Sequence, residues 1–262
     1  MLFIFAFIST TTAQRHELGV FVGASNYNGE LNPGPVNLNF IHPAFGVMYR
    51  FNKSKHVSYK LNAYYGWISG NDAQSSDTFQ LKRNLSFFSH LFDVSGVMEF
   101  NFFPFIPGTQ DINFTPYIFA GFSIFHFNPT ADFQAHNYEL RTMHTEGEPA
   151  YGQIGAAFPF GGGFKMSVTQ VINIGFELGV RKAYTNYLDD VSTIYPDPKI
   201  FANNPAAAGL SNKTNQTSQS LIGRQRGNPN GSDWYNFAGF WITFNVFKIG
   251  KHSCEAFPKF RY

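Results

Sequence analysis

The strongest constraint on the fold is an alternation of apolar and polar residues that recurs along most of the chain. In residues 17–27, Leu18, Val20 and Val22 would share one face, and Glu17 and Phe21 the other. Successive side chains of a strand point to opposite faces, so this period of two predicts β-strands. Eight segments show it: residues 17–27, 44–51, 56–68, 87–103, 117–127, 160–168, 172–181 and 234–247.

The two faces of these segments differ in chemistry. One face is aliphatic and aromatic, whereas the other holds the charged side chains. Only 14% of all residues are charged and 18% are aromatic, including 32 Phe, against about 25% charged in an average soluble domain. Beyond the first residues no stretch approaches the 18 apolar residues of a transmembrane helix. A soluble barrel would place its apolar side chains inside and its charges outside. The pattern instead predicts an all-β fold, an eight-stranded antiparallel transmembrane β-barrel with a polar lumen.

The connections between the expected strands alternate in length. Three are short, at residues 52–55, 104–113 and 169–171, and four are longer, at residues 28–43, 70–84, 128–157 and 184–233. Bacterial outer-membrane barrels have short periplasmic turns and longer extracellular loops. We therefore expect both termini in the periplasm and the long loops outside the cell.

The ends of the chain differ from the barrel segment. Residues 1–8 are apolar and small residues lead up to Ala13, which predicts a signal peptide over residues 1–13 and export to the Gram-negative outer membrane. The barrel would then cover residues 14–250, followed by a periplasmic tail over residues 251–262. This basic and aromatic tail is a candidate partner-binding segment through Lys251, Phe257, Lys259, Phe260 and Arg261.

Charged residues on the inward faces form a balanced set. An isolated charge in a narrow lumen would be costly to desolvate, so we expect these residues to pair with one another, Arg181 with a carboxylate included. Together with the bulk of Phe21, Tyr64, Phe125 and Trp241, the pairs should plug the barrel. The predicted lumen charge network comprises Glu17, Arg50, Lys60, Asp93, Glu99, Lys165, Glu177 and Arg181.

Signals for catalysis or metal binding are weak. The eight histidines show no metal-ligand spacing, the single Cys254 cannot form an intrachain disulfide, and a net charge of +2 argues against nucleic acid. The adjacent Asp189 and Asp190 could contribute to a Ca²⁺ site, but turn and ion-pair chemistry is the favoured reading. We predict no catalytic, cofactor or metal site. A lipid-modifying enzyme using His90 with Ser86 or Ser89 is kept as an alternative.

Several short motifs resemble one known family. They are residues 23–31 (GASNYNGEL), 49–52 (YRFN), 70–72 (GND), 83–87 (RNLSF), 115–117 (TPY), 145–147 (TEG) and 159–165 (PFGGGFK). The most specific is residues 181–192 (RKAYTNYLDDVS), whose core is Tyr187, Leu188, Asp189, Asp190, Val191 and Ser192. With them the chain resembles PorG-like outer-membrane β-barrels of the type IX secretion system of Bacteroidetes, with Asn186 where that family more often has Asp.

The resemblance implies a role that no single residue could indicate. PorG-like proteins are non-enzymatic and associate with a periplasmic ring formed by a lipoprotein and its partner. The implied function is to anchor or assemble this ring in the type IX protein secretion system, with outer-membrane lipid and the ring proteins as partners and no cofactor. A small porin or solute-binding outer-membrane barrel is the alternative.

Overall fold

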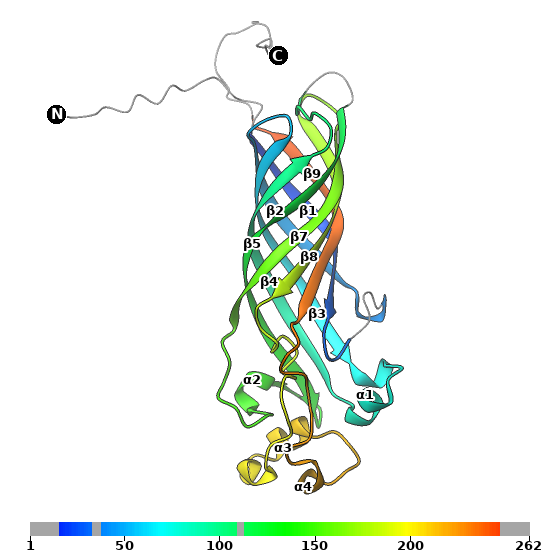
Figure 1. Cartoon of the computed structure of the whole chain (residues 1–262), viewed down its shortest axis with the longest axis vertical. Helices are drawn as coiled ribbons and strands as arrows, with labels where there is room; N and C mark the ends of the chain where they lie inside the picture. The colour runs from blue at the N-terminus through cyan, green and yellow to red at the C-terminus, as the bar shows by residue number, and fades with distance from the viewer. Residues whose placement is uncertain (1–15, 33–37, 109–112, 247–262) are drawn as a thin grey trace, which may run out of the picture.

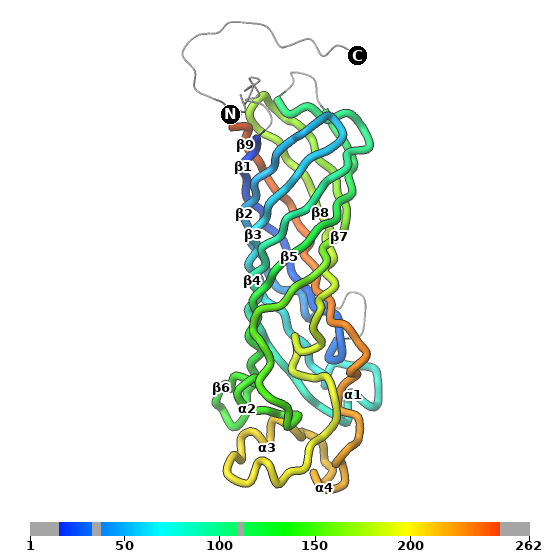
Figure 2. Tube along the Cα trace, turned by 60° about the vertical axis from the view of Figure 1, so that its left-hand side comes forward, coloured from blue at the N-terminus to red at the C-terminus, as the bar shows by residue number. Residues whose placement is uncertain are grey.

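A computed structural model describes residues 16–32, 38–108 and 113–246 of the chain. The predicted signal peptide (residues 1–13) and tail (residues 251–262) lie outside the described residues. The described part is a long β-barrel with a folded group of loops at one end (Figures 1 and 2).

Eight strands form the barrel wall, and each pairs antiparallel with its neighbours. The wall runs in the order β1-β2-β3-β4-β5-β7-β8-β9 and closes where β9 pairs with β1. A further short strand, β6 (His136–Glu139), pairs with the end of β5 in a hairpin beyond the wall. The wall strands are β1 (His16–Asn28), β2 (His42–Asn52), β3 (Val57–Asn71), β4 (Ser86–Asn101), β5 (Asn113–Phe133), β7 (Ile154–Ser167), β8 (Ile172–Ala183) and β9 (Trp234–Asn245).

The alternation places side chains as the sequence predicts. Leu18, Phe45 and Phe240 on the outer face are 52%, 47% and 70% exposed, whereas Glu17 and Arg50 on the inner face are fully buried. The outer surface of the wall is therefore apolar and the interior polar, which is the reverse of a soluble barrel. The predicted fold, a closed eight-stranded antiparallel barrel, is confirmed.

Two strands extend furthest beyond the bounds that their alternation predicts. β5 continues past Asn128 and Pro129 to Phe133 because its end pairs with β6 instead of entering a loop. β7 begins at Ile154, six residues before the first expected position, since residues 154–157 continue the ladder with β5. Both extensions lie toward the looped end of the barrel (Figure 2).

Glycine makes room where the narrow interior is most crowded. At Gly161 a Cβ atom would lie 2.1 Å from the carbonyl oxygen of Leu178 and 2.8 Å from the ring of Phe119. At Gly46 it would lie 2.1 Å from the ring of Tyr64. These positions need glycine so that inward aromatic rings can lie against the wall.

All described helices are short and belong to the connections. None of them has the length and apolarity to cross a bilayer. Apart from η2, they lie at the end of the barrel opposite the start of β1 (Figure 1). They are η2 (Leu38–Phe40), η3 (Asp72–Gln74), α1 (Thr78–Arg83), α2 (Leu140–Met143), η4 (Pro198–Phe201), α3 (Pro205–Ser211) and α4 (Ser218–Leu221). We call residues 29–32, 72–85, 134–153 and 184–233 the loop cap.

Candidate functional site

Glu99 on β4 is the centre of an ion-pair network inside the barrel. Its carboxylate lies 3.0 Å from Arg50 Nε on β2, 3.1 Å from Lys60 Nζ on β3 and 2.7 Å from Lys165 Nζ on β7. The four side chains are fully buried. One carboxylate thus joins three cations from three other strands across the interior.

Two further carboxylates complete the charge balance of this network. Arg50 Nη1 lies 3.0 Å from Glu17 on β1, and Lys60 pairs with Glu177 on β8. These two acids also accept hydrogen bonds from neutral side chains, Glu17 from Asn52 Nδ2 at 2.6 Å and Glu177 from the Tyr117 hydroxyl at 2.7 Å. The ions therefore gain the partners that a buried charge requires.

Asp93 and Arg181 stand apart from this network. Arg181 Nη1 donates to the Gly179 carbonyl at 2.7 Å, and the guanidinium lies 4.7 Å from the ring centroid of Phe237. Asp93 accepts a hydrogen bond from the Tyr235 hydroxyl at 2.8 Å. No ion pair of either residue occurs within the described ranges. The expectation that Arg181 pairs with a carboxylate is wrong, because the Arg181 guanidinium instead contacts a carbonyl of β8 and aromatic faces.

Aromatic rings fill the interior around the ions. Phe21, Tyr64, Phe125 and Trp241 are all at most 3% exposed. The ring centroids of Phe21 and Tyr64 are 4.7 Å apart, and Arg50 Cζ lies 4.2 Å from the Trp241 centroid. The lumen is thus occupied by side chains from facing strands rather than lined by them.

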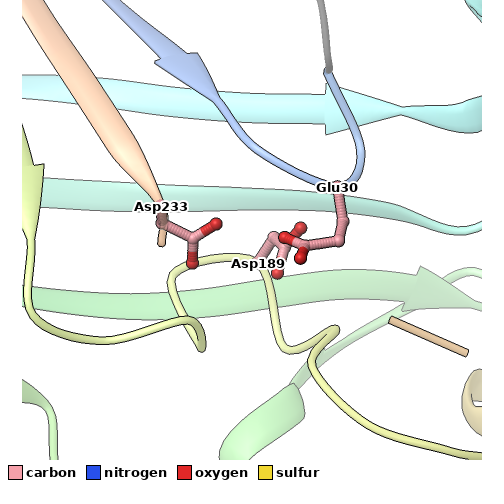
Figure 3. Close-up of side chains that lie close together, drawn as sticks. All are labelled: Glu30, Asp189 and Asp233. Carbon is pink, nitrogen blue, oxygen red and sulfur yellow. The ribbon is translucent and has the colours of Figure 1, made fainter. Parts of the chain in front are cut away.

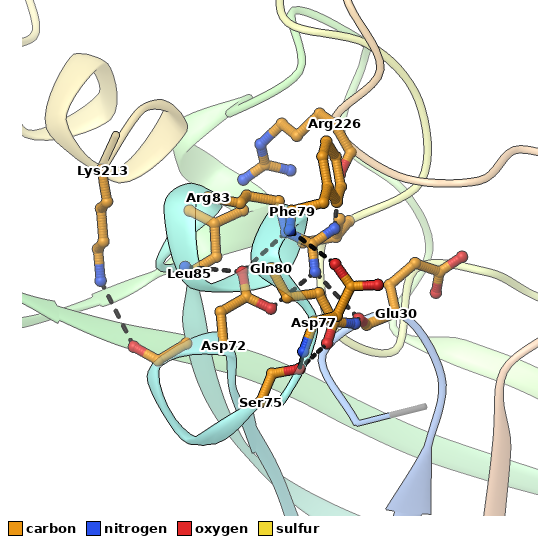
Figure 4. Close-up of polar contacts among 12 residues, drawn as sticks. Glu30, Asp72, Ser75, Asp77, Phe79, Gln80, Arg83, Leu85, Lys213 and Arg226 are labelled. Atoms are coloured by element: carbon orange, nitrogen blue, oxygen red, sulfur yellow. Dashed lines mark hydrogen bonds and ion pairs between the residues drawn. The ribbon is translucent and has the colours of Figure 1, made fainter. Parts of the chain in front are cut away.

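Two buried arginines hold the loop cap together. Arg83, at the end of α1, forms a two-point contact with Asp72 at 2.7 and 2.8 Å and donates to the carbonyls of Arg226 at 2.7 Å and Glu30 at 3.0 Å (Figure 4). α1 begins where the Asp77 side chain accepts from the Phe79 amide and ends at Asn84 with φ +55°. Arg83 therefore joins the first, second and fourth long connections.

Arg226 joins the third and fourth long connections in the same way. Its Nη1 lies 2.9 Å from Glu146 and donates to the Asp190 carbonyl at 2.6 Å, and its Nε donates to the Ser211 carbonyl at 3.2 Å. Glu146 in turn accepts from the Ser192 amide at 2.9 Å. With 1% of its surface exposed, Arg226 has exchanged water for these protein acceptors.

The motif Tyr187, Leu188, Asp189, Asp190, Val191 and Ser192 lies at the centre of the loop cap, and all of these residues but Tyr187 are buried. Asp189 accepts from the Tyr27 hydroxyl of β1 at 2.6 Å and from the Val191 amide at 2.9 Å. Asp190, with φ +65°, accepts from the Tyr151 hydroxyl at 2.9 Å. The motif fixes the loop cap to the barrel.

Three carboxyl groups, one of them from this motif, converge where the loop cap meets the barrel. Glu30, Asp189 and Asp233 each bring an oxygen within 4.8 Å of the other two (Figure 3). Three such ligands fall short of the six to eight oxygens that Ca²⁺ takes, and the Tyr27 hydroxyl already points at Asp189 and, at 3.0 Å, at Asp233. Burial raises the pKa of both aspartates well above the usual range, which favours their protonated, uncharged forms in this cluster.

The loop cap is expected to loosen as the pH rises. Burial raises the pKa of Asp190 to about 6, although the Arg226 cation opposes it. An acid whose pKa is higher in the folded state holds its proton more tightly there. The contribution of Asp190 to the stability of the loop cap is therefore complete below the unfolded pKa of about 3.9, and it is lost as the pH rises through the folded pKa of about 6. Asp189 and Asp233 shift in the same direction. Limited proteolysis of residues 184–233 should therefore be faster at pH 8 than at pH 5.

Asp190→Asn should flatten this pH dependence, whereas Asp197→Asn, at the N-cap of η4, should leave it unchanged. Faster cleavage at pH 5, with a protease equally active at both values, would contradict the assignment.

The residues of the alternative enzyme site are not assembled. Ser89 is fully buried and its hydroxyl donates to the His90 carbonyl at 3.0 Å, whereas the His90 ring is on the outer face, where its Nδ1 lies 2.6 Å from the Tyr65 hydroxyl. Ser86 accepts from Lys213 at 3.5 Å. No hydrogen bond between a serine hydroxyl and the His90 ring occurs among these described residues.

Sequence reasoning missed most of the loop cap. The sequence predicts no contacts for its charged residues, because they lie in irregular segments, where no alternation distinguishes a buried charge from a solvated one. Glu30, Asp72, Arg83 and Glu146 stand within the short family motifs, whereas Arg226 and Asp233 stand outside them. The motifs indicate special segments, but they do not indicate the ion pairs and the carboxyl cluster that these residues form.

Comparisons with known proteins give one family and several structures. The sequence matches the family described as "Domain of unknown function (DUF6089)" over residues 1–256. A search of curated proteins returns no match.

Similar solved structures include the N-terminal β-barrel domain of Pseudomonas aeruginosa OprF, with 12% identity, TM-score 0.39 and coverage of 88% of this chain and 97% of that one. Neisserial surface protein A has 6% identity and a TM-score of 0.43, and the match covers 88% of this chain and 96% of that one. The outer-membrane protein OprG of Pseudomonas aeruginosa has 10% identity and a TM-score of 0.40, and the match covers 88% of this chain and 97% of that one. At these values the likeness says nothing of ligands or partners. The family match, which spans nearly the whole sequence, is of a different weight: this chain belongs to the DUF6089 family.

Proposed function

We propose that this protein is a non-enzymatic barrel of the outer membrane, with a closed lumen, that anchors or assembles a periplasmic protein complex. The observation that carries the membrane assignment is the contrast between the two faces of the wall. Side chains such as Val22, Val47, Met98 and Phe122 are 53–59% exposed on the outside, while the ions are buried inside. Such an outer face is stable only against lipid or another apolar surface.

A closed lumen distinguishes this proposal from a porin. Glu99 joins cations from three other strands, and Trp241, Tyr64 and Phe21 occupy the space beside them. A continuous water path would have to break contacts among fully buried ions, which is costly.

The purified protein is therefore expected to give no steady conductance in planar bilayers. A barrel of similar size that is an established porin serves as the positive control for insertion. A stable and reproducible open level would overturn the closed lumen and favour the porin or solute-binding alternative.

The finer role rests on the sequence resemblance to PorG-like proteins of the type IX secretion system. With both termini in the periplasm, the short turns would face the periplasmic ring formed by a lipoprotein and its partner, and the loop cap would lie outside the cell. The buried arginines of the loop cap hold the long connections together. This supports an anchoring role in which the periplasmic partner binds at the opposite end of the barrel, where the short turns lie.

Crosslinking followed by pull-down from native outer membranes tests this role. We expect the full chain to retain periplasmic ring proteins, and a chain ending at residue 250 to stay folded in the membrane but retain less of them. Substitution of Lys199, which is exposed in the loop cap at the opposite end, by alanine is the control. Unchanged retention by the shortened chain would remove the tail from the proposal, and recovery of no ring protein would remove the anchoring role.

A further inference from the structure

The outer wall of the barrel carries a hollow that the proposed function does not use. A cavity of about 460 Å³ lies over β1, β9 and β8, and its floor includes Ala24 and Ala238. These residues are opposite each other in the β1–β9 ladder, and Ala238 is also opposite Leu178 of β8. All three occupy outward positions, so the hollow opens to the surroundings of the barrel and not to its lumen. Small side chains on a wall of larger ones create it.

The walls of the hollow are apolar and continue the outer surface of the barrel. Leu178, Val180, Trp234 and Ile41 stand around the two alanines. Next along the same strands come Val22 and Phe240, which are 56% and 70% exposed and opposite each other in the ladder. The apolar belt therefore runs without interruption into one end of the hollow.

The other end of the hollow, toward the loop cap, is polar. Asn28, Asn26 and Asn236 line it, and Asn26 donates to the Phe40 carbonyl at 3.2 Å. One step further along the ladder Lys182 is opposite Trp234, and its Nζ lies 5.7 Å from the Trp234 ring centroid. Lys182 is exposed, and no described carboxylate lies within ion-pair distance of it.

We propose that this hollow, residues Ala24, Leu178, Val180, Trp234, Asn236 and Ala238 with Lys182 at its rim, binds one acyl chain of an anionic lipid. The chain would lie over the alanines, the carboxamides would face the ester region, and the phosphate would lie beside Lys182. Along the hollow toward the loop cap, apolar side chains are followed by carboxamides, an indole and a cation. This order matches the order of groups along such a lipid, from acyl chain to ester region to phosphate. Aromatic and basic side chains take these depths at membrane interfaces. The inference rests on the proposed membrane location.

Native mass spectrometry of the folded protein in detergent tests the site. The probes are phosphatidylglycerol and phosphatidylcholine with identical acyl chains. We expect phosphatidylglycerol to be retained about fivefold more strongly, the factor for one cation beside an anionic headgroup. Lys182→Ala should abolish this preference. Lys53→Ala is the matched control, because Lys53 is also exposed and lies 5.9 Å from the ring of Tyr59 at the other end of the barrel.

A second variant tests the hollow itself. Ala238→Phe fills it from an outward position and should reduce retention of both lipids, while Ala63→Phe, also outward but on β3, should not. Unchanged lipid retention in Ala238→Phe, or a dimer in place of bound lipid, would overturn the inference. Failure of the wild-type barrel to insert into vesicles would instead count against the proposed membrane location.

Discussion

Glu99→Gln is expected to lower the free energy of unfolding of the barrel by about 3–5 kcal/mol, the usual cost of breaking a buried ion pair from one side. The amide keeps the shape of the carboxylate but removes its charge. Arg50 and Lys60 would keep Glu17 and Glu177 as partners, whereas Lys165 would lose the ion-pair partner that the structure gives it. An uncompensated ammonium group in a narrow interior is the source of the cost.

Urea unfolding of the refolded protein in lipid vesicles measures this change. The matched control is Asp93→Asn, which is equally buried but has a tyrosine hydroxyl instead of a cation as its partner. Removing that charge should cost well under half as much. Equal losses in the two variants would mean that the Glu99 network contributes no more than an ordinary buried carboxylate.

Arg226→Ala is expected to open the loop cap while the barrel stays folded. Glu146 would lose its cation, and the carbonyls of Asp190 and Ser211 would lose their hydrogen-bond donor. The free energy of local unfolding of the third and fourth long connections should therefore fall by about 3–5 kcal/mol. Because the barrel ladder does not include these residues, the loss should be local.

Limited proteolysis and hydrogen exchange distinguish local from global loss. In Arg226→Ala, residues 140–153 and 184–233 should be cleaved rapidly, and the strands should keep their protection. Arg224→Ala, two residues earlier and exposed, should behave as the wild type. Loss of strand protection in Arg226→Ala would show that the loop cap and the barrel unfold as one unit.

Much of the barrel could be predicted because its faces obey a rule of period two. The inward position of Lys60 or Glu177, for example, follows from the outward position of its neighbours, whatever lies across the barrel. The pairing of these charges needs more, since it depends on which strands face each other across the lumen. Lys60 meets Glu99 on the adjacent strand but Glu177 on a distant one. Arg181 has the same alternation yet turns to its own strand.

The loop cap could not be predicted because its order comes from long-range contacts of single side chains. Arg83 and Arg226 are separated by most of the chain, yet the guanidinium of one donates to the carbonyl of the other. In the sequence both stand among polar residues that are typical of solvated loops. The adjacent acids Asp189 and Asp190 gave a partial signal, which indicated a special segment but neither its burial nor its contacts.

The ladder between β1 and β9 joins the first described strand to the last, with Glu17 opposite Asn245. All other wall ladders join wall strands that follow one another along the chain, the longest connection being residues 184–233 between β8 and β9, so those ladders can form as the chain arrives. The final ladder cannot, since it brings together the two most distant strands and bears the largest entropy of loop closure. Until it forms, the sheet has two open edges with unpaired backbone groups. A chain of this design therefore needs protection from aggregation until its last strand has paired with its first.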